Sequence, residues 1–243
     1  MKIKLNFEIL SIILFLTMIP ITYSYNVCAV YFTGIGCPHC AKADPIVLNN
    51  LTQKYSNEPK FIVIEYEIYH DSNYNAQVYN QYLDKYKMQS GVPSILFESG
   101  NILGDRPIIE NIENVILGGP QPCQLLSGSK DFSQINISSL PGKPKIWIGD
   151  MVLIRNPNEV SNEDEVRDVL HGNYKKYEKV KPEPVPLSGR NVYFKNAVKI
   201  KGWTVEWGNE SSSMNKINYK TILLGIIIVV FLIFLLSFYS QRG

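Results

Sequence analysis

The spacing of apolar residues divides residues 27–118 into short buried runs and longer segments with a helical period. Runs rich in β-branched and aromatic residues predict buried strands, whereas apolar residues three and four positions apart predict amphipathic helices. A Ser-Gly pair between two apolar runs predicts a hairpin turn at Ser99-Gly100. The predicted order is strand, helix, strand, helix, hairpin and helix, at residues 27–34, 38–55, 60–69, 73–88, 91–105 and 107–118. The apolar stripes of the last two helices are Ala76, Tyr79, Leu83 and Tyr86, and Ile108, Ile112 and Val115.

Residues 119–208 have a weaker pattern, which contains an internal echo. Residues 142–172 resemble residues 91–119 at a constant offset of 51 positions. A degenerate copy of the first region would explain this echo. Two ordinary hairpin-plus-helix units would explain it as well, and we favour that interpretation.

The end of this second region combines a proline-rich stretch with two short apolar runs. Residues 175–190 are basic and rich in proline, which indicates a stiff connector. Residues 191–207 predict two strands whose alternation changes parity at Gly202, where a bulge is expected. The tryptophans at 203 and 207 are candidates for partner or bilayer contact, although core packing is the simpler interpretation.

Both ends of the chain are apolar. Residues 1–24 place two lysines before an apolar run and small residues, which predicts a secretory signal peptide, with an uncleaved anchor as the alternative. Residues 221–239 contain no charge and, at about 1.5 Å per residue, cover roughly 28 Å, so they predict a transmembrane helix. Residues 209–220 are then a polar tether and 240–243 a cytoplasmic tail. We therefore expect a single-pass, C-terminally anchored membrane protein with its soluble domain outside the cytoplasm.

Composition agrees with an exported protein that does not bind nucleic acid. The net charge is only +2 with both signs interspersed, so the chain lacks a basic footprint. Sequons at Asn50, Asn136 and Asn209 are candidate glycosylation sites in an extracytoplasmic protein. Four cysteines in an oxidising compartment favour disulfide or redox chemistry over zinc binding.

The most informative motif is the sequence CPHC, at Cys37 to Cys40. A redox pair, half of a metal site and a vestigial pair in a binding module are the three interpretations. A zinc ribbon needs a second closely spaced pair, which the sequence lacks. A copper-delivery module would use a CxxxC spacing and a distal histidine. The spacing here is different, and His70 and His171 are better explained as surface residues. A redox pair is therefore favoured, with no metal and no dissociable cofactor.

With its flanking motifs, the chain resembles the thioredoxin superfamily over residues 27–118. CPHC lies at a predicted strand-to-helix junction, Pro45 follows Cys40 by five residues as a helix-kinking proline does in thioredoxins, and the GVPS sequence resembles the cis-proline loop. This resemblance implies an α/β thioredoxin-like fold over 25–118, with a four-stranded mixed sheet and flanking helices. A smaller α+β or β-rich region, or a degenerate thioredoxin-like half, would follow over 119–208, and then the transmembrane helix.

The resemblance also implies roles for the site residues. Cys37 would be the nucleophile at the start of the helix, where the free N–H groups stabilise a thiolate, and Cys40 the resolving thiol. His39 would support the thiolate, and a cis Val92–Pro93 bond would align substrate backbone, with Pro38 and Val92 in the groove. Where these proteins often bury a carboxylate, six residues before the first cysteine, this chain has Tyr31. That departure favours oxidase or isomerase activity over reductase activity.

In this fold, the remaining cysteines would lie together. Cys28 opens the first strand at the end away from CPHC, and the last helix returns the chain to that end shortly before Cys123. A structural disulfide is therefore expected, and two unpaired thiols are the alternative.

The expected function is a thiol–disulfide oxidoreductase acting on thiols or disulfides of exported proteins, with an unidentified membrane redox partner and the lipid bilayer as further contacts. A non-catalytic thioredoxin-like binding or assembly module, or a metal-delivery module, is the alternative.

Overall fold

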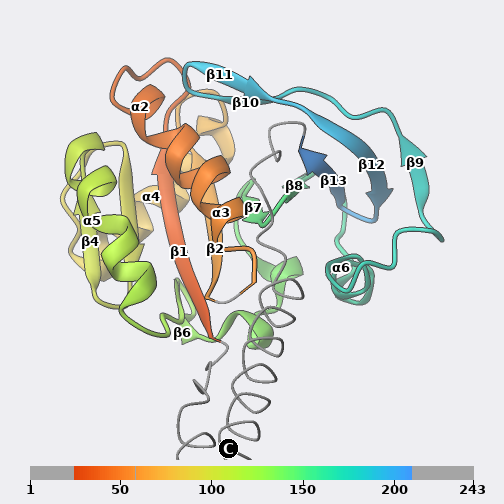
Figure 1. Cartoon of the computed structure of the whole chain (residues 1–243), viewed down its shortest axis with the longest axis horizontal. Helices are drawn as coiled ribbons and strands as arrows, with labels where there is room; N and C mark the ends of the chain where they lie inside the picture. Colours follow the sequence, from red (N-terminus) through yellow and green to blue (C-terminus); the bar gives the residue numbers. More distant parts are fainter. Residues whose placement is uncertain (1–24, 58, 210–243) are drawn as a thin grey trace, which may run out of the picture. The chain divides into compact units, whose positions relative to one another are not determined.

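The computed structural model describes residues 25–57 and 59–209. The first half of this span contains the predicted elements in the predicted order (Figure 1). They are β1 (Asn26–Thr33), α2 (Cys40–Asp44), a π-helical segment (Pro45–Leu51), α3 (Thr52–Lys54), β2 (Lys60–Glu67), α4 (Ser72–Tyr86), β3 (Ser94–Phe97), β4 (Gly100–Leu103) and α5 (Asp105–Leu117). The helix expected over 38–55 is thus continuous but changes its winding at Pro45, because proline supplies no N–H for the normal α-helical ladder.

The second half consists mainly of strands. They are β5 (Cys123–Leu125), β6 (Gly128–Lys130), β7 (Lys145–Ile148), β8 (Met151–Arg155), β9 (Glu178–Val180), β10 (Val185–Leu187), β11 (Arg190–Val192), β12 (Phe194–Ile200) and β13 (Trp203–Asn209). The helical elements are two 3₁₀ turns (Phe132–Gln134 and Ile137–Ser139) and α6 (Glu163–Leu170). The two echoing hairpins, β3–β4 and β7–β8, begin 51 positions apart.

The fold-class prediction of a four-stranded thioredoxin-like sheet followed by a separate smaller region is wrong. The described residues belong to one compact unit, and nine strands form one mixed sheet in the order β4-β3-β1-β2-β7-β8-β13-β12-β9. β1 and β2 are parallel and the other neighbours are antiparallel. The physical reason is that β2 does not end the sheet: β7 pairs with its outer edge, with Glu65 opposite Lys145.

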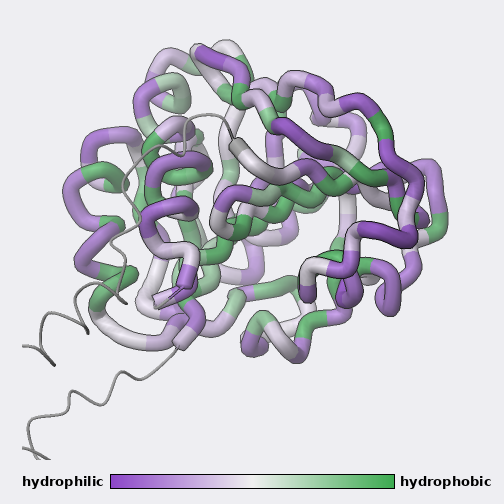
Figure 2. Tube along the Cα trace, turned by 45° about the vertical axis from the view of Figure 1, so that its right-hand side comes forward, coloured by the Kyte–Doolittle hydropathy of each residue, from purple (hydrophilic) through white to green (hydrophobic). Residues whose placement is uncertain are grey.

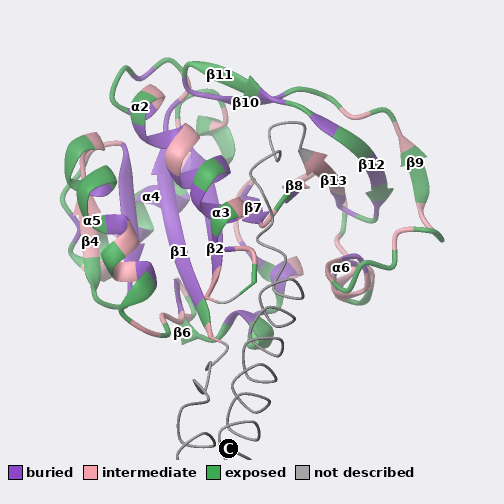
Figure 3. Cartoon of the chain, in the orientation of Figure 1, coloured by how far each residue is buried: buried purple, intermediate pink, exposed green. Residues whose placement is uncertain are grey.

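Both faces of the sheet are covered, so the core has two layers. One face of the strands packs against α4, the 3₁₀ turns and α6, and the other packs against the α2–α3 helix, α5 and the β10–β11 hairpin. Figure 2 shows the hydrophobic stretches along the strands, and Figure 3 shows β1 buried over nearly its whole length. In α4 the buried stripe is Asn75, Val78, Tyr79 and Tyr82, one position away from the predicted stripe at Ala76 and Leu83, and in α5 Ile116 is buried more fully than Val115.

Two local predictions for the second half are corrected by the structure. The proline-rich stretch 175–190 is not a simple connector, because it forms the edge strand β9 and most of the β10–β11 hairpin. Gly202 is not a bulge: Ile200 pairs with Trp203, so Gly202 lies in the two-residue turn of the β12–β13 hairpin, at a φ of +80°. Trp203 is buried and Trp207 stacks on Tyr174 with ring centroids 4.1 Å apart, which agrees with core packing.

Cys28 and Cys123 form a disulfide at the start of β1, the pair expected from the sequence. The bridge spans 95 residues and lies at the opposite end of β1 from the CPHC motif. The predicted signal peptide, transmembrane helix and tail fall outside the described residues, as does the predicted tether apart from Asn209, which ends β13. Within the two described ranges, none of the helices has the length and hydrophobicity of a membrane span.

Candidate redox site

The CPHC motif lies in the loop and first helical turn that follow β1. The Cys37 N–H donates to the carbonyl of Gly34 at 3.0 Å, and the Cys40 N–H donates to the Cys37 sulfur at 3.2 Å. This contact gives the sulfur a backbone donor at the beginning of the helix, as a nucleophilic thiolate requires. Both cysteines are free thiols; Cys37 is 7% exposed and Cys40 is fully buried.

The predicted cis-proline loop lies next to Cys37. The Val92–Pro93 peptide bond is cis, as the sequence predicts. The Val92 carbonyl is 3.8 Å from the Cys37 sulfur, and the Pro93 carbonyl accepts a hydrogen bond from Gly104 at 2.8 Å. Pro38 is exposed and Val92 is partly buried, so the candidate groove residues border the sulfur at the surface. The structure therefore brings Cys37, Cys40, Val92 and Pro93 together.

His39 is directed to a carboxylate at the start of α5. Its Nδ1 lies 2.9 Å from Asp105 Oδ1, and Lys42 Nζ lies 3.2 Å from Asp105 Oδ2. The hydrogen bonds from His39 and Lys42 lower the pKa of Asp105 to about 2. A charged His39 would therefore have a carboxylate as its nearest partner, which weakens the stabilisation that it was expected to give the Cys37 thiolate.

A buried carboxylate, Asp44, lies one helical turn after Cys40 and was missed by the sequence analysis. Its Oδ1 accepts hydrogen bonds from the hydroxyls of Tyr31 at 2.8 Å and Thr33 at 2.7 Å, and its Oδ2 accepts one from the Ser188 N–H at 3.0 Å. Asp44 is fully buried. Tyr31 on β1 occupies the position where an acid was expected. Its hydroxyl instead donates a hydrogen bond to Asp44, the acid on α2.

The environments of Asp44 and Cys40 perturb both groups. Burial raises the pKa of Asp44 to about 6, although Thr33 and Tyr31 donate hydrogen bonds to its charged form. Burial and the interaction with Cys37 raise the pKa of Cys40 to about 12, against the opposing effect of the Thr33 hydroxyl. The Thr33 hydroxyl therefore acts on both groups: it donates a hydrogen bond to Asp44 at 2.7 Å, and it lowers the pKa of Cys40. At pH 7 this pair is a protonated thiol beside a base that is mostly ionised.

A second buried carboxylate, Glu67 at the end of β2, fixes the loops around the cysteines. It accepts hydrogen bonds from four backbone N–H groups, those of Ile35, Tyr69, His70 and Asp71, at 2.8–2.9 Å. Burial would raise the pKa of Glu67, but these four donors outweigh it and lower the pKa. Tyr69 is held with its ring over Gly34 and remains 52% exposed near the cysteines. Glu67 was not singled out from the sequence. The signal that could have identified it is its position at the end of a predicted strand, directly before a loop.

Comparisons of the chain with protein-family models, curated proteins and solved structures find no match. The resemblance to the thioredoxin superfamily accordingly stays a prediction based on the motifs. The geometry of the site itself consists of a thiol at a helix start, a second thiol one turn later and a buried carboxylate one turn after the second thiol.

The other candidate residues are at the surface wherever their side chains are described. Asn50 and Asn136 are exposed, whereas the side chain of Asn209 is outside the described set. His70 and His171 are exposed. In the described ranges no group of three or more His, Cys, Asp or Glu side chains is arranged to hold a metal ion.

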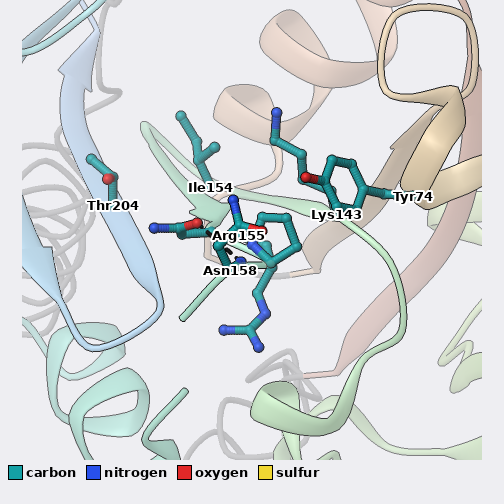
Figure 4. A pocket seen from close by; sticks show the side chains of 8 residues that line it. Tyr74, Lys143, Ile154, Arg155, Asn158 and Thr204 are labelled. Carbon is teal, nitrogen blue, oxygen red and sulfur yellow. Dashed lines mark hydrogen bonds between the residues drawn. The ribbon is translucent and has the colours of Figure 1, made fainter. Parts of the chain in front are cut away.

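A pocket of about 280 Å³ lies between the start of α4, β8 and β13, and it contains no cysteine (Figure 4). Its lining residues are Tyr74, Lys143, Ile154, Arg155, Asn156, Pro157, Asn158 and Thr204. Lys143 Nζ is paired with Asp71 at 2.8 Å, and Arg155 donates to the Gly202 carbonyl at 3.0 Å. Both cations therefore already have partners within the protein.

Proposed function

We propose that the protein is a thiol–disulfide oxidoreductase that uses Cys37 and Cys40, without a dissociable cofactor, on thiols or disulfides of exported proteins. The observation that carries the proposal is the buried Asp44 carboxylate, which lies one helical turn after Cys40 and accepts a hydrogen bond from Thr33, together with a Cys37 sulfur that accepts a backbone N–H. A pair of cysteines kept only for packing needs no ionisable group beside it, and burying one is costly.

In the reducing direction, the Cys37 thiolate attacks one sulfur of a substrate disulfide and expels the other as a thiolate, which leaves a mixed disulfide. Cys40 then loses its proton through the Thr33 hydroxyl to Asp44. The resulting Cys40 thiolate forms a bond with the Cys37 sulfur and expels the second substrate thiolate. Two electrons pass from the cysteine pair to the substrate. The oxidising direction is the reverse, and Asp44 then returns the proton to Cys40.

Asp44 changes the reasoning about direction. The preference for oxidase or isomerase activity rested on the absence of a buried acid at position 31, yet Asp44 gives Cys40 a proton acceptor from another position. Reduction therefore has the base that it requires. The direction is set by the reduction potential of the pair against its unidentified membrane partner.

The cellular setting belongs to the same proposal. The predicted signal peptide and membrane anchor would place the redox site outside the cytoplasm. The Cys28–Cys123 disulfide supports this setting, because structural disulfides are typical of oxidising compartments. The bilayer would be contacted through residues 221–239.

The test uses the full chain, purified in detergent, with the variants Cys37→Ser and Cys40→Ser. The wild type should exchange its cysteine pair with a glutathione buffer at a defined potential. Cys40→Ser should accumulate a mixed disulfide through Cys37, whereas Cys37→Ser should form none, because Cys40 is fully buried. A wild type whose pair neither oxidises nor reduces across the glutathione range would exclude catalysis and favour the binding or assembly module.

A further inference from the structure

The β10–β11 hairpin returns to the redox helix from the far part of the sequence. Figure 1 shows it in blue at the top of the view, running back toward α2. Its strands, Val185–Leu187 and Arg190–Val192, pair in an antiparallel register, and Ser188 and Gly189 form the turn at its tip. The tip contacts residues that lie 144–151 positions earlier in the chain.

Ser188 makes one hydrogen bond to each part of the redox site. Its N–H donates to Asp44 Oδ2 at 3.0 Å, and its hydroxyl donates to the Cys37 carbonyl at 2.9 Å. Ser188 is fully buried, so both contacts are shielded from water. One residue of the second half thus holds both the candidate base and the backbone of the nucleophile.

The tip fits closely against the helix. Gly189 has a φ of +84°, and a Cβ added there would lie 2.9 Å from the Cβ of Ala41. Only glycine meets both conditions without displacing the tip. Val185, Leu187 and Val192 anchor the hairpin in the core layer that also contains α5. The position of Ser188 is therefore fixed by packing on both sides.

We propose that Ser188 is a positioning residue for the redox pair: its N–H fixes the Asp44 carboxylate toward Thr33 and Cys40, and its hydroxyl fixes the Cys37 carbonyl. This inference rests on the proposed function. With Oδ2 held by Ser188, Oδ1 remains on the side of the Thr33 hydroxyl, where the proton of Cys40 arrives. The second half of the chain thereby contributes directly to the resolving step.

The groups that face Asp44 determine what the loss of this contact should do. Asp44 interacts electrostatically with Tyr31 from β1, with Cys40 from the same helix and with Glu65 from β2. Glu65 is itself paired with Lys145 from β7. On the hairpin, the charged Arg190 lies 3.5 Å from the Pro45 carbonyl. The Ser188 N–H favours the carboxylate, so its removal should raise the pKa of Asp44.

Two substitutions separate the two contacts. Ser188→Ala removes the hydroxyl and keeps the N–H. Ser188→Pro also removes the N–H, and the turn accepts proline there, because it precedes a glycine with positive φ, as in a type II turn. The exposed Ser127, in the turn between β5 and β6, provides the matched control Ser127→Ala. If Ser188→Pro does not fold, Gly189→Ala replaces it, since the added Cβ pushes the tip away from Ala41.

The experiment uses the full chain and two measurements. In the first, Cys37 reacts with an aromatic disulfide reagent that releases a coloured thiolate, and the release of the second thiolate by Cys40 is followed against pH. In the second, the carboxyl carbon of Asp44 is titrated by NMR. We expect Ser188→Pro to move both midpoints upward by about one pH unit, which makes the step about tenfold slower below the midpoint. Ser188→Ala should slow the step at every pH without moving the midpoint, and Ser127→Ala should change neither quantity.

The outcomes distinguish this inference from the proposed function. If the wild type releases no second thiolate, the proposed redox function fails. If the wild type reacts normally but Ser188→Pro and Gly189→Ala retain its midpoint in both measurements, the positioning role of Ser188 is refuted while the redox function stands. A uniform loss of rate in Ser188→Pro with an unchanged Asp44 titration would also refute it.

Discussion

Replacing Asp44 by asparagine should remove a pH-dependent loss of stability and make the protein less active. Asp44 is fully buried, and its charge is compensated by hydrogen bonds from Tyr31, Thr33 and Ser188 rather than by a cation. Burial raises its pKa from 3.8 to about 6, which means that the folded protein prefers the neutral carboxyl group. Asparagine has nearly the same shape and stays neutral at every pH, so it resembles the protonated acid.

The size of the effect follows from the raised pKa. Each pKa unit corresponds to about 1.4 kcal/mol, so a rise from 3.8 to about 6 corresponds to about 3 kcal/mol. Below pH 3.8 the group is protonated in both folded and unfolded states, and it has no effect. As the pH rises from about 4 to about 6, the unfolded chain loses this proton first, and folding becomes less favourable. The full cost of about 3 kcal/mol is present above pH 6 and is absent in Asp44→Asn.

The assay is urea unfolding of the wild type and Asp44→Asn at several pH values from 4 to 7.5, with the Cys37–Cys40 pair in one defined redox state. The difference in unfolding free energy between the two proteins should grow by about 3 kcal/mol toward pH 7. The resolving step should slow by a factor on the order of 10²–10⁴, as expected when a general base is removed. Parallel stability curves would refute the assignment of a raised pKa to Asp44, and an unchanged resolving rate would refute its role as the base.

Three further variants test other parts of the structure. Replacing Cys28 and Cys123 by alanine should lower the unfolding free energy by roughly 2–5 kcal/mol, because the bridge closes a loop of 95 residues; an unchanged denaturation midpoint would contradict the bridge. Lys145→Met should cost about 3–5 kcal/mol by leaving Glu65 buried without its cation, and adding Glu65→Gln should recover part of that loss, as measured by urea unfolding. Glu67→Gln should be less stable at pH 7 but approach wild-type stability in acid, since four N–H donors lower the pKa of Glu67; stability curves that stay parallel down to pH 3 would exclude this.

The local elements of the first half could be predicted because their signals are local. The β-branched runs, the helical stripes and the GVPS loop each specify a short segment, and the Val92–Pro93 bond and the Cys28–Cys123 pair agree with the prediction. The one-position error in α4 has a specific cause. Asn75 is buried because its side chain bonds Lys143 and the Glu67 carbonyl, and a polar residue with distant partners does not look like a core position.

The sheet could not be predicted beyond its first strands, because the pairing that extends it joins residues distant in sequence. Glu65 and Lys145 are 80 positions apart, and each alone resembles a surface charge, yet together they form a buried pair between β2 and β7. The stretch 175–190 was misinterpreted for a different reason. Its prolines suggest stiffness, while the signal that matters is the alternation of apolar residues around the Ser188-Gly189 turn, with Val185 and Leu187 before it and Val192 after it.

Asp44 could have been found in the sequence. The resemblance directs attention to position 31, but Asp44 lies four residues after Cys40 in a predicted helix, and that spacing places both side chains on the same face. Ser188 left no comparable signal, since a turn serine far along the chain looks like any exposed turn residue. The site therefore divides into a part encoded by helical spacing and a part that only the tertiary fold brings together.

That division explains why the second half of the chain contributes to the proposed redox site. It is attached at both ends of β1: at one end the disulfide joins Cys28 to Cys123, and at the other Ser188 contacts Cys37 and Asp44. Between them, Lys145 on β7 pairs with Glu65, and Glu65 in turn raises the pKa of Asp44. A general base works best when its pKa lies near the operating pH, and the pKa of Asp44 is about 6. Burial raises this pKa, while hydrogen bonds from Tyr31, Thr33 and the Ser188 N–H lower it, so residues from both halves set the pKa of one carboxyl group.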